Sequence, residues 1–63
     1  MSEDKEILVI ASKVKQYIRS RSDMNTSANV MAVLSDRIRA LCDEAIENAR
    51  RDKRKTVKDR DIP

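Results

Sequence analysis

Apolar side chains recur every three or four residues through the middle of the chain, as on one face of an amphipathic helix. This stripe consists of Val30, Leu34, Ile38, Leu41, Ala45 and Ala49, and it is widened by Met31, Val33, Cys42 and Ile46. The pattern predicts a helix from about Ser27 to Asp52, ~39 Å long at about 1.5 Å per residue. No other segment is long enough to cover its apolar face. We therefore expect that face to pack on the first helix and on a second copy of itself.

A shorter stripe at helical spacing comes earlier in the chain. Ile10, Val14, Tyr17 and Ile18 predict a first helix that ends near Ser20. Ahead of it, residues 7–10 form an uninterrupted apolar run that fits either a short strand or the entry to this helix. Residues 1–6 are polar, and we expect them to form a disordered N-terminal segment.

The segments between and after the two stripes indicate loops. Residues 23–27 form the first loop. It contains three residues of types that cap a helix N-terminus, namely Asn25, Thr26 and Ser27, and the sequence favours none of them over the others. After the long helix a basic loop follows, and residues 58–62 predict about one helical turn before Pro63. The sequence thus predicts an all-α fold in which residues 7–63 form a single domain.

Composition limits what so small a domain can be. The chain has 63 residues, of which 40% are charged and 40% hydrophobic, with no glycine and one proline. Domains of this size seldom stabilise themselves without disulfides, a metal or a partner. One cysteine and no histidine exclude an intrachain disulfide and a zinc site, which leaves self-association. No apolar run approaches the ~18 residues of a membrane span, and we expect a cytoplasmic protein.

The charges are segregated along the chain. Residues 7–22 carry four basic residues and no acid, and residues 50–60 carry seven basic residues against two acidic ones. Between them, residues 23–47 hold five acids against two arginines. Folding can bring the two basic segments together into one surface for a polyanion.

Nothing in the sequence points to an enzyme. There is no histidine and no glycine-rich loop, and we expect no cofactor, no metal and no small-molecule substrate. Cys42 lies on the apolar stripe, which predicts a buried structural thiol. Tyr17, the only aromatic residue, lies on a core stripe and offers no platform for stacking single-stranded bases.

One motif carries a resemblance to a known family. A long amphipathic helix is followed by Arg54-Lys55-Thr56, with Asp61 seven residues after the arginine. This arrangement resembles the histone fold, and it is similar to the minimal, tail-less histones of bacteria and archaea over about residues 9–62. The resemblance implies a short helix, a long central helix and a truncated third helix, arranged as an intertwined head-to-tail homodimer on double-stranded DNA in the nucleoid.

The family pattern also implies roles for particular residues. It places the first loop of one chain beside the second loop of its partner, on one DNA-facing edge, and it pairs Arg54 with Asp61 as a clamp. Arg54 is expected either to brace that loop or to contact phosphate, with both roles open. The candidate DNA-binding residues are Lys53, Arg54, Lys55, Thr56, Lys58, Lys13, Lys15, Arg19, Arg21, Asn25, Thr26 and Ser27. The candidate dimer core is Val30, Leu34, Ile38, Leu41, Cys42, Ala45 and Ile46.

The chain departs from the family pattern in three ways. The third helix is truncated, and the end of the long helix presents Asn48 and Arg51 where relatives join dimers together. No residue of the first helix matches the family's minor-groove arginine cleanly; Lys13, Lys15 and Arg19 are the candidates. The long helix also begins about one turn late. We therefore expect a dimer as the main species, which bends or coats DNA rather than wrapping it.

Two other functions are compatible with the sequence. A ribbon–helix–helix repressor would use residues 6–10 as a strand in the major groove, although such a strand should alternate polar and apolar residues. A histone-fold protein-interaction subunit would instead pair with a different chain, for which Asp43, Glu44 and Glu47 on the long helix offer an acidic surface. Sequence-specific binding would favour the first, and failure to self-associate the second.

Overall fold

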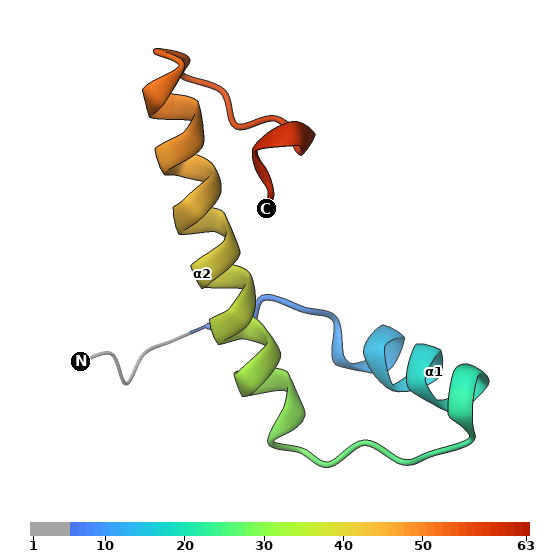
Figure 1. The fold of residues 1–63 in the computed structure, drawn as a ribbon. Helices are drawn as coiled ribbons and strands as arrows, with labels where there is room; N and C mark the ends of the chain where they lie inside the picture. Colours follow the sequence, from blue (N-terminus) through green and yellow to red (C-terminus); the bar gives the residue numbers. More distant parts are fainter. Residues whose placement is uncertain (1–5) are drawn as a thin grey trace.

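The computed structural model describes residues 6–63 and contains only helices as regular secondary structure in that range. The order is α1 (Ala11–Ser22), α2 (Val30–Arg51) and a single 3-10 turn, η1 (Asp59–Asp61). Figure 1 shows α1 and α2 standing apart as the two arms of an open V, with η1 returning toward the middle of α2. The all-α prediction is confirmed for these residues, whereas most of the N-terminal segment predicted to be disordered lies outside them.

Helix α1 begins and ends later than the apolar spacing predicted. Ile10 is extended and precedes the helix, and its carbonyl accepts the N–H groups of Lys13 and Val14 at 3.0 and 3.1 Å. The helix continues to Ser22, two residues beyond the predicted end, where Asp23 takes a left-handed conformation with φ of 58°. The apolar run of residues 7–10 forms neither strand nor helix. It is an irregular segment, with a bend at Val9, that leads into α1.

Helix α2 begins three residues later than predicted, and none of the three expected residues caps it. Asn29 precedes the helix in a helical conformation without a side-chain cap. The N–H of Val30 donates to the Ser27 carbonyl at 3.2 Å, so a turn over residues 28–29 leads into the helix. The Asn25 side chain is engaged elsewhere, because it accepts from Arg19 at 2.8 Å. The helix of 22 residues is ~33 Å long.

The turn η1 packs back on the second half of α2. Ala45 and Ala49, on the face of α2 toward this region, are 0% and 4% exposed. The Asn48 side-chain amide donates to the Asp61 carbonyl at 2.8 Å, which holds η1 against the helix. The predicted helical turn over residues 58–62 is thus present as three residues of 3-10 helix.

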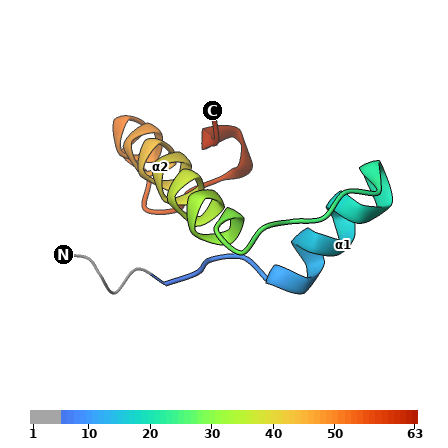
Figure 2. The same ribbon diagram turned by 90° about the horizontal axis from the view of Figure 1, so that it is seen from below.

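A single chain buries very little apolar surface. Among the described residues only Met31, Ala45 and Ala49 are buried hydrophobics, and α1 contains no buried residue. The radius of gyration is 14.7 Å, whereas a compact chain of this length would have about 11 Å. Figure 2 shows the same openness from below, with α1 well separated from α2. This conformation leaves an unusual amount of hydrophobic surface uncovered.

Two buried positions predicted from the sequence are exposed in the single chain. Cys42 is exposed, and Tyr17 is 64% exposed. The prediction is wrong for the single chain: Cys42 is exposed because neither α1 nor the second loop covers its part of the α2 stripe, and Tyr17 is exposed because α1 stands apart from α2 (Figure 2). Leu41 and Ile46 of the candidate dimer core are also exposed, at 40% and 39%, whereas Val30, Leu34 and Ile38 are half-buried.

In the described part of the chain, no helix is long and apolar enough to cross a membrane.

Candidate nucleic-acid interface

The second loop starts from a defined helix end. The N–H of Arg54 donates to the Ala49 carbonyl at 3.0 Å, and the N–H of Lys53 donates to the Arg50 carbonyl at 2.9 Å. These two bonds form the Schellman pattern that closes many helices. The pattern places Lys53 in the left-handed region with φ of 57°, where glycine is normally favoured. The lysine side chain therefore extends from a strained backbone position.

Arg54 and Asp61 clamp the loop between them. Two guanidinium nitrogens of Arg54 donate to the two carboxylate oxygens of Asp61, at 2.7 and 3.0 Å. The side chains are 18% and 5% exposed, so this bidentate pair is mostly shielded from solvent. The N–H of Lys58 adds a third bond to the same carboxylate at 2.7 Å. The pairing that the resemblance implied for these two residues is present.

Two further hydrogen bonds hold Arg54 within the chain. Its Nε donates to Asp52 at 2.7 Å, and one of its terminal nitrogens donates to the Thr56 carbonyl at 2.8 Å. Asp52 in turn pairs with Arg60 at 3.3 Å. A guanidinium with four hydrogen bonds to its own loop has little left with which to bind a ligand.

The clamp changes the acid–base behaviour of the loop. Hydrogen bonds from Arg54 and from the Lys58 N–H lower the pKa of Asp61 to about 2. The bond from Arg54 also lowers the pKa of Asp52, and both carboxylates raise the pKa of Arg54. All three groups are therefore ionised at neutral pH, and the loop is held by charged hydrogen bonds.

The lowered pKa of Asp61 predicts that the folded chain loses stability in acid. Folding lowers the pKa of Asp61 from its ordinary value near 4 to about 2. The ionised carboxylate therefore stabilises the folded chain fully above about pH 4, and this stabilisation is lost as the pH falls toward 2. We expect Asp61→Asn to lower the melting temperature at neutral pH, and the difference from wild type to shrink as pH falls from about 5 to about 2. Calorimetry of both proteins across that range checks it. A difference that stays constant with pH would contradict the charged clamp.

Cationic and polar side chains stand out from the clamped loop. Lys53, Lys55, Thr56 and Lys58 are all exposed. Within residues 6–63, neither Lys53 nor Lys55 forms an ion pair. The side chain of Arg54 is thus occupied within the clamp, whereas these neighbouring side chains are accessible to an anion.

The first loop carries a second, separate group of candidate residues. Arg19 connects the end of α1 to this loop, because it donates to Asn25 at 2.8 Å and pairs with Asp23 at 3.3 Å. Lys15 and Thr26 line a hollow between α1 and the loop together with Arg19 and Asn25. Thr26 Oγ1 is buried and has no hydrogen-bond partner among the described residues. The hollow is therefore basic on one side and polar on the other.

The remaining basic residues of α1 are exposed. Lys13 and Arg21 lie on the solvent-facing surface, and the Arg21 guanidinium stands 6.0 Å from the Tyr17 ring centre. That distance is within range of a cation–π contact. Ser27 is also exposed, but it lies farther along the loop at an apolar hollow by the start of α2.

A single chain does not bring the two loops together. Figure 1 places the first loop at the start of α2 and the second loop beyond its other end. A helix of 22 residues separates them by ~33 Å. The two loops therefore do not form a joint surface within one chain.

Sequence reasoning missed the most deeply buried polar side chain. Ser35 is 0% exposed, and its hydroxyl donates to the Met31 carbonyl at 2.8 Å and accepts from the Leu8 N–H at 2.9 Å. Its position four residues after Met31 lies on the apolar side of α2. A serine among apolar residues at helical spacing was the available signal.

Comparison with known proteins does not assign this chain to a family. No protein-family model matches this chain, and no curated protein matches it. Within residues 6–63 no group of His, Cys, Asp and Glu side chains is placed to hold a metal ion. Function has to be inferred from the two loops and from the uncovered apolar surface.

Proposed function

We propose that this chain is a histone-fold subunit that forms an intertwined head-to-tail homodimer and binds double-stranded DNA without reading its sequence. Its role is to organise or compact the chromosome within the nucleoid. The observation that carries the proposal is the Arg54–Asp61 clamp at the end of a long helix, with Lys53 and Lys55 exposed beside it. The same residues carry the resemblance to the histone fold.

The chemistry of the loops favours contact with the phosphate backbone. Lysine and arginine side chains neutralise phosphates and release counterions, which gives affinity that depends on salt but not on base sequence. Threonine hydroxyls and backbone N–H groups add hydrogen bonds that position the duplex. Because the donors of Arg54 are engaged within its own loop, we assign it the bracing role and assign Lys53, Lys55 and Thr56 the phosphate contacts.

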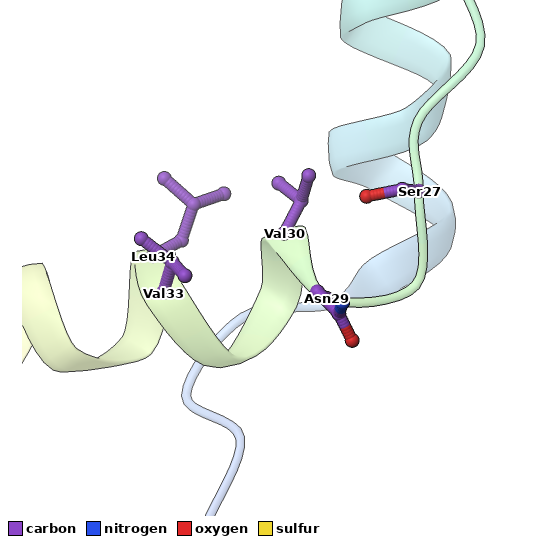
Figure 3. A pocket seen from close by; sticks show the side chains of 5 residues that line it. All are labelled: Ser27, Asn29, Val30, Val33 and Leu34. Atoms are coloured by element: carbon purple, nitrogen blue, oxygen red, sulfur yellow. The ribbon is translucent and has the colours of Figure 1, made fainter.

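The uncovered apolar surface supports a second copy as the partner. At the start of α2, Val30, Val33 and Leu34 line an open hollow beside the first loop (Figure 3). Near the other end of the helix, Val57 is 46% exposed and Ile62 is 45% exposed. Antiparallel crossing of two α2 helices would bring these two apolar surfaces together, as a two-fold interface requires.

Charge favours the same antiparallel arrangement. Residues 50–60 carry seven basic residues against two acidic ones, so a parallel pair would place two strongly basic loops side by side. In the antiparallel pair each basic loop adjoins a first loop whose only charged residue between 22 and 29 is Asp23. Both basic loops then lie at the two ends of one DNA-facing edge.

The end of α2 supports a dimer as the main species. Asn48 donates to the Asp61 carbonyl, and Arg51 donates to the Asn48 side-chain oxygen at 3.0 Å. These polar groups satisfy one another within the chain, and they offer no apolar surface on which a second dimer can pack. We therefore propose that separate dimers bend or coat DNA rather than wrapping it continuously.

Sedimentation of the purified protein, alone and with a short duplex, tests the binding unit. The protein alone should sediment with twice the mass of one chain, and titration should add mass to the duplex in steps of one dimer. A monomer that binds no duplex would reject the homodimer and favour a protein-interaction subunit, for which the groove lined by Asp43, Glu44 and Glu47 is the available surface.

A ribbon–helix–helix repressor needs the backbone of residues 7–10 free to pair with a second chain. The N–H of Leu8 is instead engaged by Ser35 of the same chain. The backbone of this segment is therefore partly committed to α2 and is poorly suited to pair across a dimer. This observation favours the histone-fold proposal over the repressor.

The strained position of Lys53 allows stability and binding to be separated. Glycine relieves the left-handed conformation, so Lys53→Gly should stabilise each chain by roughly 0.5–1 kcal/mol and raise the melting temperature by a few degrees. The same change removes a phosphate contact and should weaken DNA binding. Lys53→Ala is the matched control, because it loses the charge but keeps the strain. If Lys53→Gly bound DNA as wild type does, Lys53 would not be a contact residue.

The reactivity of Cys42 reports on the dimer without any substitution. The thiol is exposed in the single chain and lies on the apolar stripe of α2. In the proposed dimer the partner chain covers this thiol, and a reagent reaches it only when the dimer opens or dissociates. Alkylation should therefore be at least about tenfold slower than in denaturant. The rate should rise on dilution below the dimer dissociation constant. Rapid alkylation at all concentrations would contradict an interface at Cys42.

A further inference from the structure

The residues before α1 form a strap across α2, which we define as residues 6–10. The Leu8 N–H donates to the Ser35 hydroxyl at 2.9 Å, and Arg39 donates to the Glu6 carbonyl. The segment appears in blue in Figure 1, where it lies against the first half of α2. Glu6 and Ile7 border a small hollow on α2 that Ser35 and Arg39 complete. The strap is therefore attached at two points, one turn of α2 apart.

Helix α1 is fixed to the end of this strap. The Ile10 carbonyl accepts the N–H groups of Lys13 and Val14, so the first turn of α1 is built directly on the last strap residue. No α1 residue is buried, and within one chain α1 is therefore located by its two connections rather than by packing. Figure 2 shows these connections, the strap on one side and the first loop on the other. Any shift of the strap moves the start of α1.

Four basic residues depend on that position, namely Lys13, Lys15, Arg19 and Arg21. We propose that Ser35 is a positioning residue for DNA binding, because its hydroxyl fixes the strap and thereby holds Lys15 and Arg19 of α1, which line one hollow beside the first loop, toward the duplex. This inference rests on the proposed function. Ser35 itself is 0% exposed, so its role is to position the strap and not to contact phosphate.

The chemistry of the site requires a hydroxyl. The Ser35 oxygen accepts from the Leu8 N–H while its proton goes to the Met31 carbonyl, so both capacities are used. Alanine would leave the Leu8 N–H without this partner, although alanine is the better helix former. If Ser35 mattered only for the stability of α2, Ser35→Ala would be neutral or favourable. A loss of DNA binding with the helix intact is thus specific to the strap.

Duplex affinity of Ser35→Ala, measured against salt concentration, tests the inference. If one phosphate contact is lost in each chain, affinity near ~0.15 M salt should fall by about 30-fold and the log–log salt slope should become shallower by about 1.8. The dimer and its helix content should be retained. Ser20→Ala is the matched control, because Ser20 also bonds a carbonyl one turn earlier, at 3.2 Å, but holds no strap.

A double-mutant cycle separates positioning from general weakening. Lys15→Gln should reduce the affinity of wild type, and its effect should be less than half as large on a logarithmic scale when Ser35 is alanine. Arg39→Gln, which removes the second attachment from the surface of α2, should reduce the effect of Lys15→Gln in the same way. If Ser35→Ala does not fold, the Arg39→Gln variant provides the same test of the strap.

The possible failures are distinguishable. Wild-type affinity and slope in Ser35→Ala, or an effect of Lys15→Gln that is the same in every background, would overturn the positioning role while leaving the proposed function intact. Absence of duplex binding by the wild-type dimer would instead remove the proposed function, and this inference with it.

Discussion

Leu41→Asp is expected to abolish folding and dimerisation together. Leu41 is 40% exposed in a single chain, and a substitution at such a position in a monomer usually changes stability by less than about 0.5 kcal/mol. In the proposed dimer the partner α2 covers this residue. The substitution then costs at least as much as leucine to alanine in a core, roughly 3 kcal/mol in each chain. Two copies remove roughly 6 kcal/mol, comparable to the whole stability of a small domain.

Ala40→Asp is the matched control for that experiment. Ala40 is the preceding residue of the same helix, is exposed, and points about 100° away from Leu41 around the helix axis. Circular dichroism and sedimentation should show that Ala40→Asp remains a helical dimer while Leu41→Asp is largely unfolded and monomeric. A folded Leu41→Asp protein with wild-type melting temperature would show that the apolar stripe is not an obligate interface.

Lys55→Glu is expected to weaken binding to all duplexes alike. Each dimer carries two copies, and the loss of two phosphate contacts at ~0.15 M salt lowers affinity by about 30-fold, with repulsion by the introduced carboxylates adding to this. The salt slope should become shallower by about 1.8. Because Lys55 is exposed and forms no ion pair with a described residue, the dimer should stay intact.

Arg37→Glu provides the control with the same change of charge. Arg37 lies on α2, away from both loops, and is exposed. It should alter affinity only through long-range electrostatics, which salt largely screens. Equal losses in the two variants would mean that net charge, rather than the second loop, governs binding. A loss in Lys55→Glu that differs between duplex sequences would indicate base readout.

The long helix was the part of the fold most open to prediction. Its apolar stripe extends over about six turns, and α2 follows that stripe closely at its C-terminal end. The sequence predicts its start three residues early, because three good capping residues stand in a row at positions 25–27. Capping depends on local hydrogen bonds, and the Asn25 side chain is taken by Arg19 of α1. A single sequence does not reveal such a tertiary competition.

The burial of individual residues was harder to predict than the helices. Periodicity places Cys42 and Tyr17 on apolar stripes, but it does not say which chain covers them. In the single chain both are exposed. In the proposed dimer the partner chain covers the exposed part of the α2 stripe, so apolar spacing there would predict an interface rather than the core of one chain.

The candidate site also has a part that the sequence predicts and a part that it does not. The Arg54–Asp61 pairing was expected from the motif, because the resemblance specifies both residue types and their spacing. The strap and Ser35 were not expected, because a bond between Leu8 and Ser35 joins residues 27 positions apart and neither belongs to the motif. Long-range polar contacts of this kind leave only a weak trace in one sequence.

Dimerisation and DNA binding are coupled in this proposal. The two loops lie at opposite ends of α2 in one chain (Figure 1), so the DNA-facing edge exists only when a second chain supplies the complementary loop. Substitutions in the apolar stripe should therefore abolish DNA binding as well. Substitutions at Lys53 or Lys55 should weaken only the binding and leave the dimer intact. This asymmetry distinguishes a composite surface from one contained within a single chain.

Fluorescence anisotropy of the wild-type dimer on several unrelated duplexes of equal length, at low and near-physiological salt, tests the central claim most directly. The proposal predicts similar affinities for all sequences. If about six phosphates are contacted, these affinities should fall by roughly 10³-fold between ~50 mM and ~200 mM salt. Tight, salt-tolerant binding to one duplex, or no binding at either salt concentration, would contradict it.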